Sequence, residues 1–182
     1  AIYKINGKNS NSFEAIKYFN KNAGVSRISK LLRFFKKTKT DEINALYSES
    51  CYKYFSNAKP TIGAIKFLKK LKSKNIKIKL IILSGGEENE IKNFLSYNNI
   101  SLIFNGILAS EKGKYEHLIE SNAEQNDVFI GDSANDLRVA IKYNMYFIQL
   151  CDYQSDKSAP KLLAYDKMYK FGNFSDLLNN LW

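Results

Sequence analysis

The stretch Val-Phe-Ile-Gly-Asp-Ser-Ala-Asn-Asp-Leu-Arg-Val-Ala, residues Val128–Ala140, joins an apolar strand to a helix through a turn that carries two carboxylates. The spacing of Asp132 and Asp136 lets both face one point at the start of the helix. Paired oxygen ligands of this kind suit Mg²⁺, which usually also draws ligands from a substrate phosphate. A structural role fits the same residues, because Asp132 can cap the helix and Asp136 is favourable in its first turn. The segment therefore predicts either a metal site or a well-capped helix.

On both sides of this stretch, from Pro60 onward, apolar strands alternate with amphipathic helices. This rhythm predicts an α/β fold, a doubly wound parallel sheet with helices on both faces. The expected strands are Ile76–Leu83, Ser101–Leu108 (one strand or two short ones), Asp127–Ile130, Met145–Leu150 and a weak one at Lys167–Phe171. The expected helices are Ile62–Lys72, Glu87–Tyr97, Tyr115–Ser121, Asn135–Tyr143 and Phe174–Leu181.

The first third of the chain lacks this alternation of strands and helices. Ala1–Ile5 is a short apolar strand candidate, and the region from residue 13 to residue 57 shows helical periodicity only. We therefore expect an α/β core made of residues 1–12 and 58–182, with residues 13–57 inserted as a small all-helical cap. Three expected strands end in polar or glycine-containing turns, at Ile5, Leu83 and Ile130. If these strands are neighbours, the turns meet in one crevice, where such sheets bind ligands.

Composition limits the classes of function. The sequence is 45% hydrophobic and 25% charged, typical of a soluble globular protein, and no apolar run approaches the length of a membrane span. The net charge of +10 comes from lysines spread along the chain, so we do not expect a nucleic-acid partner. Cys51 and Cys151 lie far apart in no metal-ligand spacing. Two free thiols lead us to expect a cytoplasmic protein.

Several segments, in order along nearly the whole chain, resemble the motifs of haloacid dehalogenase (HAD)-superfamily phosphatases. Val128–Ala140 resembles the fourth motif, Gly-Asp-Ser-x-x-Asp followed by a helix. Leu80–Gly85 is similar to the second motif, an apolar strand that ends in Ser or Thr. Ser110–His117 resembles the third, a lysine just ahead of a helix, and Pro60–Gly63 lies where that family re-enters its core after a helical cap.

The resemblance implies a role for each matching residue. Ser84, Gly85, Gly131 and Ser133 would lie around a bound phosphate or other anion, together with Lys112 or Lys114. Lys112 fits the family spacing slightly better than Lys114. Asp132 and Asp136 would hold Mg²⁺ if a metal binds. His117, the only histidine, lies behind these lysines, and we expect it to be exposed or half-buried without a catalytic role.

The first motif of the family is an Asp-x-Asp pair at the end of the first strand, of which the first Asp attacks phosphorus and the second protonates the leaving group. Aligned on this chain, the motif places Lys4 at the nucleophile and Asn6 at the acid/base position. No Asp-x-Asp pair occurs anywhere in the sequence. On this alignment, a Lys4 ammonium would stand in for the metal beside Asp132 and Asp136 and abolish turnover.

The sequence thus supports two hypotheses. In the first, the chain is a pseudoenzyme of HAD type, without a cofactor, that binds a small phosphorylated or anionic ligand or a protein partner. In the second, it is an active Mg²⁺-dependent phosphomonoester hydrolase that uses an unorthodox nucleophile or residues from another chain. The helical insertion would set specificity; its candidate crevice residues are Phe34, Phe35, Lys36, Lys37, Tyr47 and Tyr54.

Overall fold

The computed structural model describes residues 1–74, 77–109, 112–154 and 165–181 as an α/β fold with two parallel sheets. In the first sheet, β1 (Ile81–Leu83) pairs with β2 (Gly106–Leu108). In the second, β4 (Tyr146–Leu150) lies between β3 (Val128–Gly131) and β5 (Met168–Phe171). The expected strands are thus found, in shorter form for the first two. Of the expected strand Ile76–Leu83, residue 76 lies outside the described residues.

Helices flank both sheets, as the alternating pattern predicts. They are α5 (Ala64–Ser73), α6 (Glu88–Tyr97), α7 (Lys114–Glu120), α8 (Ala134–Tyr143) and α9 (Phe174–Leu181), with short 3-10 turns at Ser101–Ile103 and Cys151–Tyr153. One hydrophobic cluster lies between α8 and the second sheet and is centred on Phe147 and Leu137. A second joins Phe67 of α5 to Leu177 and Leu178 of α9, and Ile130 and Ile148 pack against it.

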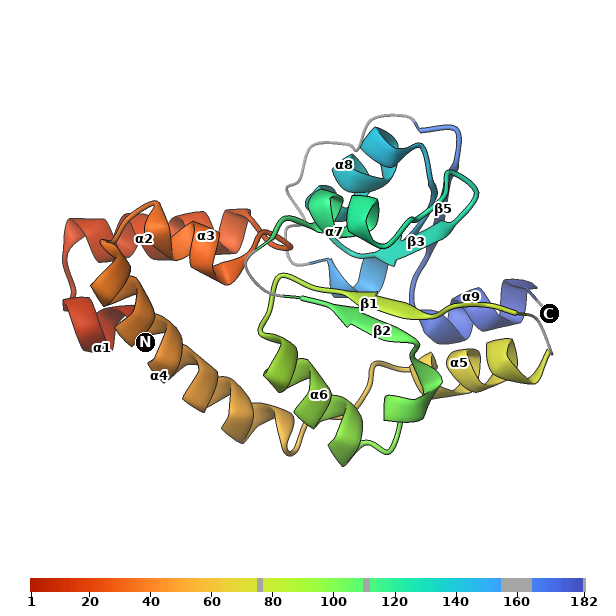
Figure 1. The fold of residues 1–182 in the computed structure, drawn as a ribbon, viewed down its shortest axis with the longest axis horizontal. Coiled ribbons are helices and arrows are strands. Elements are labelled where there is room, and N and C mark those ends of the chain that lie inside the picture. Colours follow the sequence, from red (N-terminus) through yellow and green to blue (C-terminus); the bar gives the residue numbers. More distant parts are fainter. Residues whose placement is uncertain (75–76, 110–111, 155–164, 182) are drawn as a thin grey trace.

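Four helices at the N-terminal end form a separate unit, which we call the helical unit (Figure 1). They are α1 (Ile2–Asn6), α2 (Ser10–Lys21), α3 (Arg27–Leu32) and α4 (Lys37–Phe55). The unit has a core of its own, formed by Ile2, Ala15, Leu31, Phe35 and Ile43. None of the described helices is long and apolar enough to cross a membrane.

The strand expected at Ala1–Ile5 is wrong, because Ile2–Asn6 is helical. As a strand, the segment would place Ile2 and Ile5 on opposite faces. As a helix it places them three residues apart on one face, and both pack into the core of the helical unit. α1 contacts α2 and α4, at the end of the unit that lies farthest from the sheets (Figure 1).

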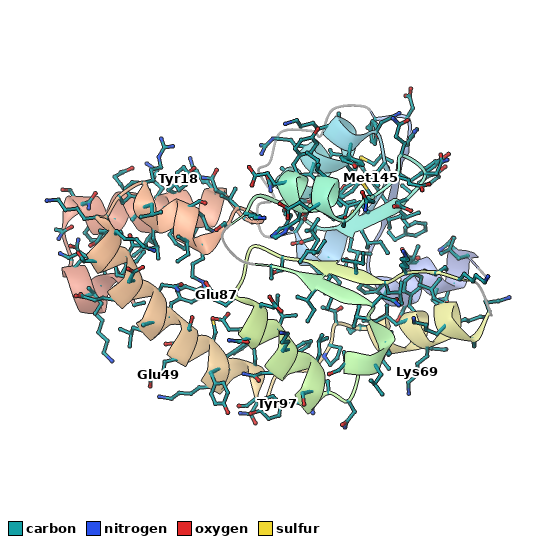
Figure 2. All side chains as sticks on the ribbon, in the orientation of Figure 1. Tyr18, Glu49, Lys69, Glu87, Tyr97 and Met145 are labelled. Atoms are coloured by element: carbon teal, nitrogen blue, oxygen red, sulfur yellow. The ribbon has the colours of Figure 1, made fainter. Side chains whose placement is uncertain are left out.

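A buried ion pair joins the helical unit to the first sheet's helix, α6. The guanidinium of Arg27 donates two hydrogen bonds to the carboxylate of Glu90, at 2.9 and 2.7 Å, and both side chains are less than 10% exposed. Arg27 also donates to Ser48 Oγ at 3.0 Å and stacks over the ring of Tyr47. Beside this pair, Asn44 donates to Glu87, which Figure 2 labels where α6 begins and faces the unit.

Burial alone would raise the pKa of the Glu90 carboxyl, but the hydrogen bonds and the charge of Arg27 hold that pKa below its ordinary value. We therefore expect Glu90→Ala to lower the free energy of unfolding by about 3 kcal/mol, since it leaves the Arg27 charge buried and unpaired. Urea denaturation near neutral pH measures this loss. The stabilisation should disappear in acid, as the pH falls through the lowered pKa of Glu90.

Glu49→Ala is the matched control, because Glu49 pairs with Lys53 at 2.7 Å on the exposed side of α4. That pair is screened by water, so its loss should leave the unfolding free energy nearly unchanged. Equal losses from the two substitutions would contradict a special role for the buried pair.

Candidate functional site

The turn between β3 and α8 is held in place by Asp136. Its Oδ2 accepts hydrogen bonds from the backbone N–H of Ser133 at 3.1 Å and from the Ser133 hydroxyl at 2.7 Å. The Ser133 Oγ in turn accepts from the backbone N–H of Asp136 at 3.2 Å, which completes a capping box. A β-carbon at position 131 would lie 2.7 Å from the Asp136 side chain, so only glycine fits at Gly131.

The other oxygen of Asp136 binds Lys114, the first residue of α7. Lys114 Nζ lies 2.5 Å from Asp136 Oδ1, and the two side chains are 11% and 4% exposed. Lys112 pairs instead with Glu120 on the surface, where both side chains are more than half exposed. Lys114 is therefore the lysine that faces the site, and the slight preference for Lys112 from the spacing is wrong. Residues 110 and 111 of the third motif lie outside the described residues.

Asp132 is the carboxylate of the turn that has no cation against it. It is half-buried, and among the described residues no other side chain donates a hydrogen bond to it. Burial first, and then the negative charge of Asp136, raise the pKa of the Asp132 carboxyl above its ordinary value, while Lys114 acts in the opposite direction. The ionised form of Asp132 is therefore disfavoured in the folded protein, and a nearby cation would stabilise it.

The turn after β1 supplies a hydroxyl and backbone amides. Ser84 Oγ accepts a hydrogen bond from the backbone N–H of Gly86 at 3.1 Å, and its own hydroxyl proton is donated to no group among the described residues. The carbonyl of Gly85 accepts from the backbone N–H of Arg27 at 3.2 Å. The start of α3 is thus fastened to the end of β1.

The loop between α2 and α3, residues 22–26, brings the two turns together. Gly24 O accepts from Asn135 Nδ2 at 3.2 Å, and a β-carbon on Gly24 would lie 2.8 Å from Ser133 Oγ. Gly24 has φ +80°, which also favours glycine. The neighbouring Val25 carbonyl is in close contact with Gly85. The turns after β1 and β3 therefore converge beneath this loop, as the expected crevice requires for two of its three turns.

The third expected turn, at Asn6, is absent from the site. Lys4 is exposed on α1, and Asn6 accepts a hydrogen bond from Lys39 and donates one to Ser12, all within the helical unit. These contacts lend no support to the alignment of Lys4 and Asn6 with the first motif, or to the idea that Lys4 replaces the metal, and both stay predictions from the sequence. The first motif has no counterpart among the described residues.

Two of the cap residues expected at the crevice lie elsewhere. Phe35 is buried inside the helical unit and Tyr54 is 70% exposed, whereas the unit reaches the site through Gly24 and Val25. A glycine between two predicted helices was the available signal, but nothing in the sequence showed which turn it would approach. His117 was expected at or near the surface and is in fact buried, with its Nε2 unpartnered among the described residues.

The carboxylates of the turn could contribute a ligand to a metal ion, but they do not surround one. Among the described residues there is no group of three or more His, Cys, Asp or Glu side chains placed to hold a metal. Both oxygens of Asp136 are engaged by Lys114 and Ser133, so Asp132 is the ligand that remains. Mg²⁺ is often bound through one or two carboxylates, with water and phosphate completing its shell, so Asp132 fits that role.

Comparison with known proteins shows the family of the chain. Residues 7–150 match the model of the haloacid dehalogenase-like hydrolase family. No curated protein matches the chain. Solved structures do resemble it. A haloacid dehalogenase-like family hydrolase from Streptococcus pneumoniae superposes with a TM-score of 0.69 and 19% identity, over 100% of this chain and 87% of that one.

Two further solved structures share the fold. A protein described as a dehalogenase gives a TM-score of 0.60 at 16% identity, over 99% of this chain and 91% of its own. A HAD-superfamily hydrolase from Ehrlichia chaffeensis gives 0.50 at 21% identity, over 99% of this chain and 84% of its own. At these identities the likeness shows the fold.

The raised pKa of Asp132 leads us to expect a pH-dependent effect of this residue on the free energy of unfolding. Because the folded state disfavours ionised Asp132, Asp132→Asn should increase the free energy of unfolding near pH 7. The gain should vanish below about pH 4, the ordinary pKa range of Asp, where the wild-type carboxyl is protonated both folded and unfolded. Chemical denaturation of both proteins across this pH range measures it. Asp41→Asn, which removes the exposed partner of Lys37, should give no gain; a gain at neutral pH for both variants would contradict the assignment.

Proposed function

Because the chain belongs to the haloacid dehalogenase-like hydrolase family, we propose that it binds a phosphorylated or similarly anionic ligand in the crevice beneath residues 22–26, and that residues 1–182 do not hydrolyse it. One observation supports both parts. Ser84, Lys114, Asp132 and Asp136 lie at the two converging turns, whereas no carboxylate pair of the Asp-x-Asp kind exists in the sequence.

Each of these residues has a defined task in the proposal. The free hydroxyl proton of Ser84 and the backbone amides that follow it donate to phosphate oxygens. Lys114 contributes a positive charge within reach of Asp136 and the ligand. Asp132 holds Mg²⁺ when the metal is bound, and such an ion neutralises phosphate charge. Gly131 and Ser133 set the shape of the turn on which this arrangement depends.

The same contacts support the second part of the proposal, that residues 1–182 do not hydrolyse the ligand. Hydrolysis of this type needs a carboxylate free to attack phosphorus and a second group to protonate the leaving oxygen. Asp136 accepts hydrogen bonds at both oxygens, and Lys114 is tied to it. Asp132, as the metal ligand, is the last carboxylate of the turn, and Asn6, far away on α1, has no titratable proton.

A second candidate function is hydrolysis of a small phosphomonoester by the same site. The observation in its favour is that the turns carrying Ser84 and Asp132 converge beneath residues 22–26, with Lys114 paired to Asp136. A carboxylate nucleophile from polypeptide outside these residues would complete it.

Lys114→Gln tests ligand binding. We expect it to weaken binding of inorganic phosphate in the presence of Mg²⁺ about tenfold, the usual size of one charge-assisted hydrogen bond. Isothermal titration calorimetry measures the affinity. Lys112→Gln, two residues away and paired with Glu120 on the surface, is the control and should leave the affinity unchanged. Equal affinities for the wild type and both variants would refute the role of Lys114.

Turnover separates the two candidate functions. We expect the 182-residue chain to release no phosphate from a panel of phosphomonoesters, with or without Mg²⁺, while it still binds inorganic phosphate. Metal-dependent turnover that Asp132→Asn abolishes would overturn the non-catalytic proposal in favour of the hydrolase.

A further inference from the structure

Lysines occur throughout this chain, but acidic residues are distributed unevenly. The longest stretch of the sequence without an acidic residue runs from residue 50 to residue 86, and it contains nine lysines. Five of these lysines lie on α5 or directly after it. The positive charge of this helix is therefore not balanced by any carboxylate of its own segment.

The lysines of α5 lie on the side that faces solvent. Ala64 and Phe67 are buried on the other side, where Phe67 packs against α9. Lys66 and Lys69 are three residues apart, so they lie on one side of the helix, roughly opposite to these buried residues. Both lysines are exposed. The helix thus presents a cationic side to its surroundings.

Large apolar side chains are exposed next to this cationic side. Leu102, in the 3-10 turn that follows α6, is 100% exposed. α5 contacts this turn, and just beyond it Lys72 Nζ donates to Asn105 Oδ1 at 3.3 Å. α6 contacts the turn as well, and its Tyr97 is exposed, with the hydroxyl 3.0 Å from that of Tyr52 on α4. Leu102 therefore lies between a lysine-rich helix and a pair of exposed tyrosines.

These residues belong to one side of the molecule. Figure 2 labels Tyr97 and Lys69 on the same side, together with Glu49 of α4. The carboxylate of Glu49 is paired with Lys53 at 2.7 Å, so it does not offset the charge of α5. We call this surface the basic–apolar face. It consists of Tyr52, Tyr97, Leu102, Lys66, Lys69 and Lys72.

Two classes of partner carry enough negative charge for this surface, an anionic membrane and an acidic protein. The residue types favour the membrane. Lysine is depleted in protein–protein interfaces, whereas each lysine close to an anionic bilayer adds to the affinity. A fully exposed leucine fits the boundary between lipid headgroups and acyl chains, where amphipathic tyrosine rings are also stable.

From these observations we propose that the basic–apolar face docks on the surface of an anionic lipid bilayer. Leu102 inserts at the level of the headgroups, and Lys66, Lys69 and Lys72 lie against their negative charges. The chain lies on the bilayer rather than across it. Ser84 and Lys114 are not part of this face, so docking does not depend on whether the crevice holds a phosphorylated ligand.

Co-sedimentation of the 182-residue chain with lipid vesicles tests the proposal. The probes are vesicles of phosphatidylcholine alone and vesicles in which about one lipid in three is phosphatidylserine. The chain should bind the anionic vesicles at least about thirtyfold more tightly, and added salt should weaken this binding. Replacing both Lys66→Gln and Lys69→Gln should weaken it about thirtyfold, because each lysine near such a surface contributes about a factor of five.

The matched control replaces Lys17→Gln and Lys21→Gln on α2, at the opposite end of the molecule from α5 (Figure 1). It removes the same charge and should leave the affinity unchanged. Leu102→Ser keeps the charge and should weaken binding to anionic vesicles about tenfold, since it removes the inserted apolar group. Its free energy of unfolding should equal that of the wild type, because the side chain is fully exposed.

Three outcomes would overturn the proposal. The first is equal binding, or none, with neutral and anionic vesicles. The second is an equal loss from the two lysine pairs, since attraction would then follow net charge alone. The third is that polyglutamate binds as tightly as the anionic vesicles while Leu102→Ser weakens neither, since the face would then recognise an acidic protein.

Discussion

The buried pair of Arg27 and Glu90 is the contact on which the arrangement of this protein depends. Two opposite charges, each with little exposure to water, are stable only together, and they belong to different parts of the fold. Arg27 directly follows the loop of residues 22–26, so the pair that anchors α3 to α6 also holds Gly24 and Val25 over the crevice. If the pair separated, α3 would lose its charged anchor on α6, next to the loop that covers the two turns.

In the turn between β3 and α8, the charges are distributed unequally. Asp136 accepts hydrogen bonds from Lys114 and from Ser133, whereas burial opposes the charge of Asp132, which forms no ion pair with a lysine among the described residues. Asp132 and Asp136 are equivalent in the sequence motif, but the structure gives them different surroundings. One shapes the site, and the other is available to a ligand or a metal.

Much of this could be predicted from residues. The strand ending in Gly131, the Ser84 turn and the alternation after Pro60 each carry a strong local signal, and the structure contains them. Ala1–Ile5 misled because Ile2 and Ile5 satisfy a strand and a helix equally over five residues, and the decision came from distant partners such as Leu31 and Ile43. Similarly, Lys112 and Lys114 are only two positions apart in the sequence, and the location of Asp136 is what distinguishes them. The periodicity of apolar residues along a sequence does not show which distant segments contact each other.

The capping box of α8 has a consequence for how such a sequence changes over time. Asp136 and Ser133 secure the start of a helix that covers the main core, and Gly131 has room for no other side chain. Replacing any of them would harm folding whether or not the site performs chemistry. Selection for a stable protein would therefore preserve this motif through a long period without catalysis. The presence of this motif in a sequence therefore reports on the architecture of the turn as much as on its chemistry.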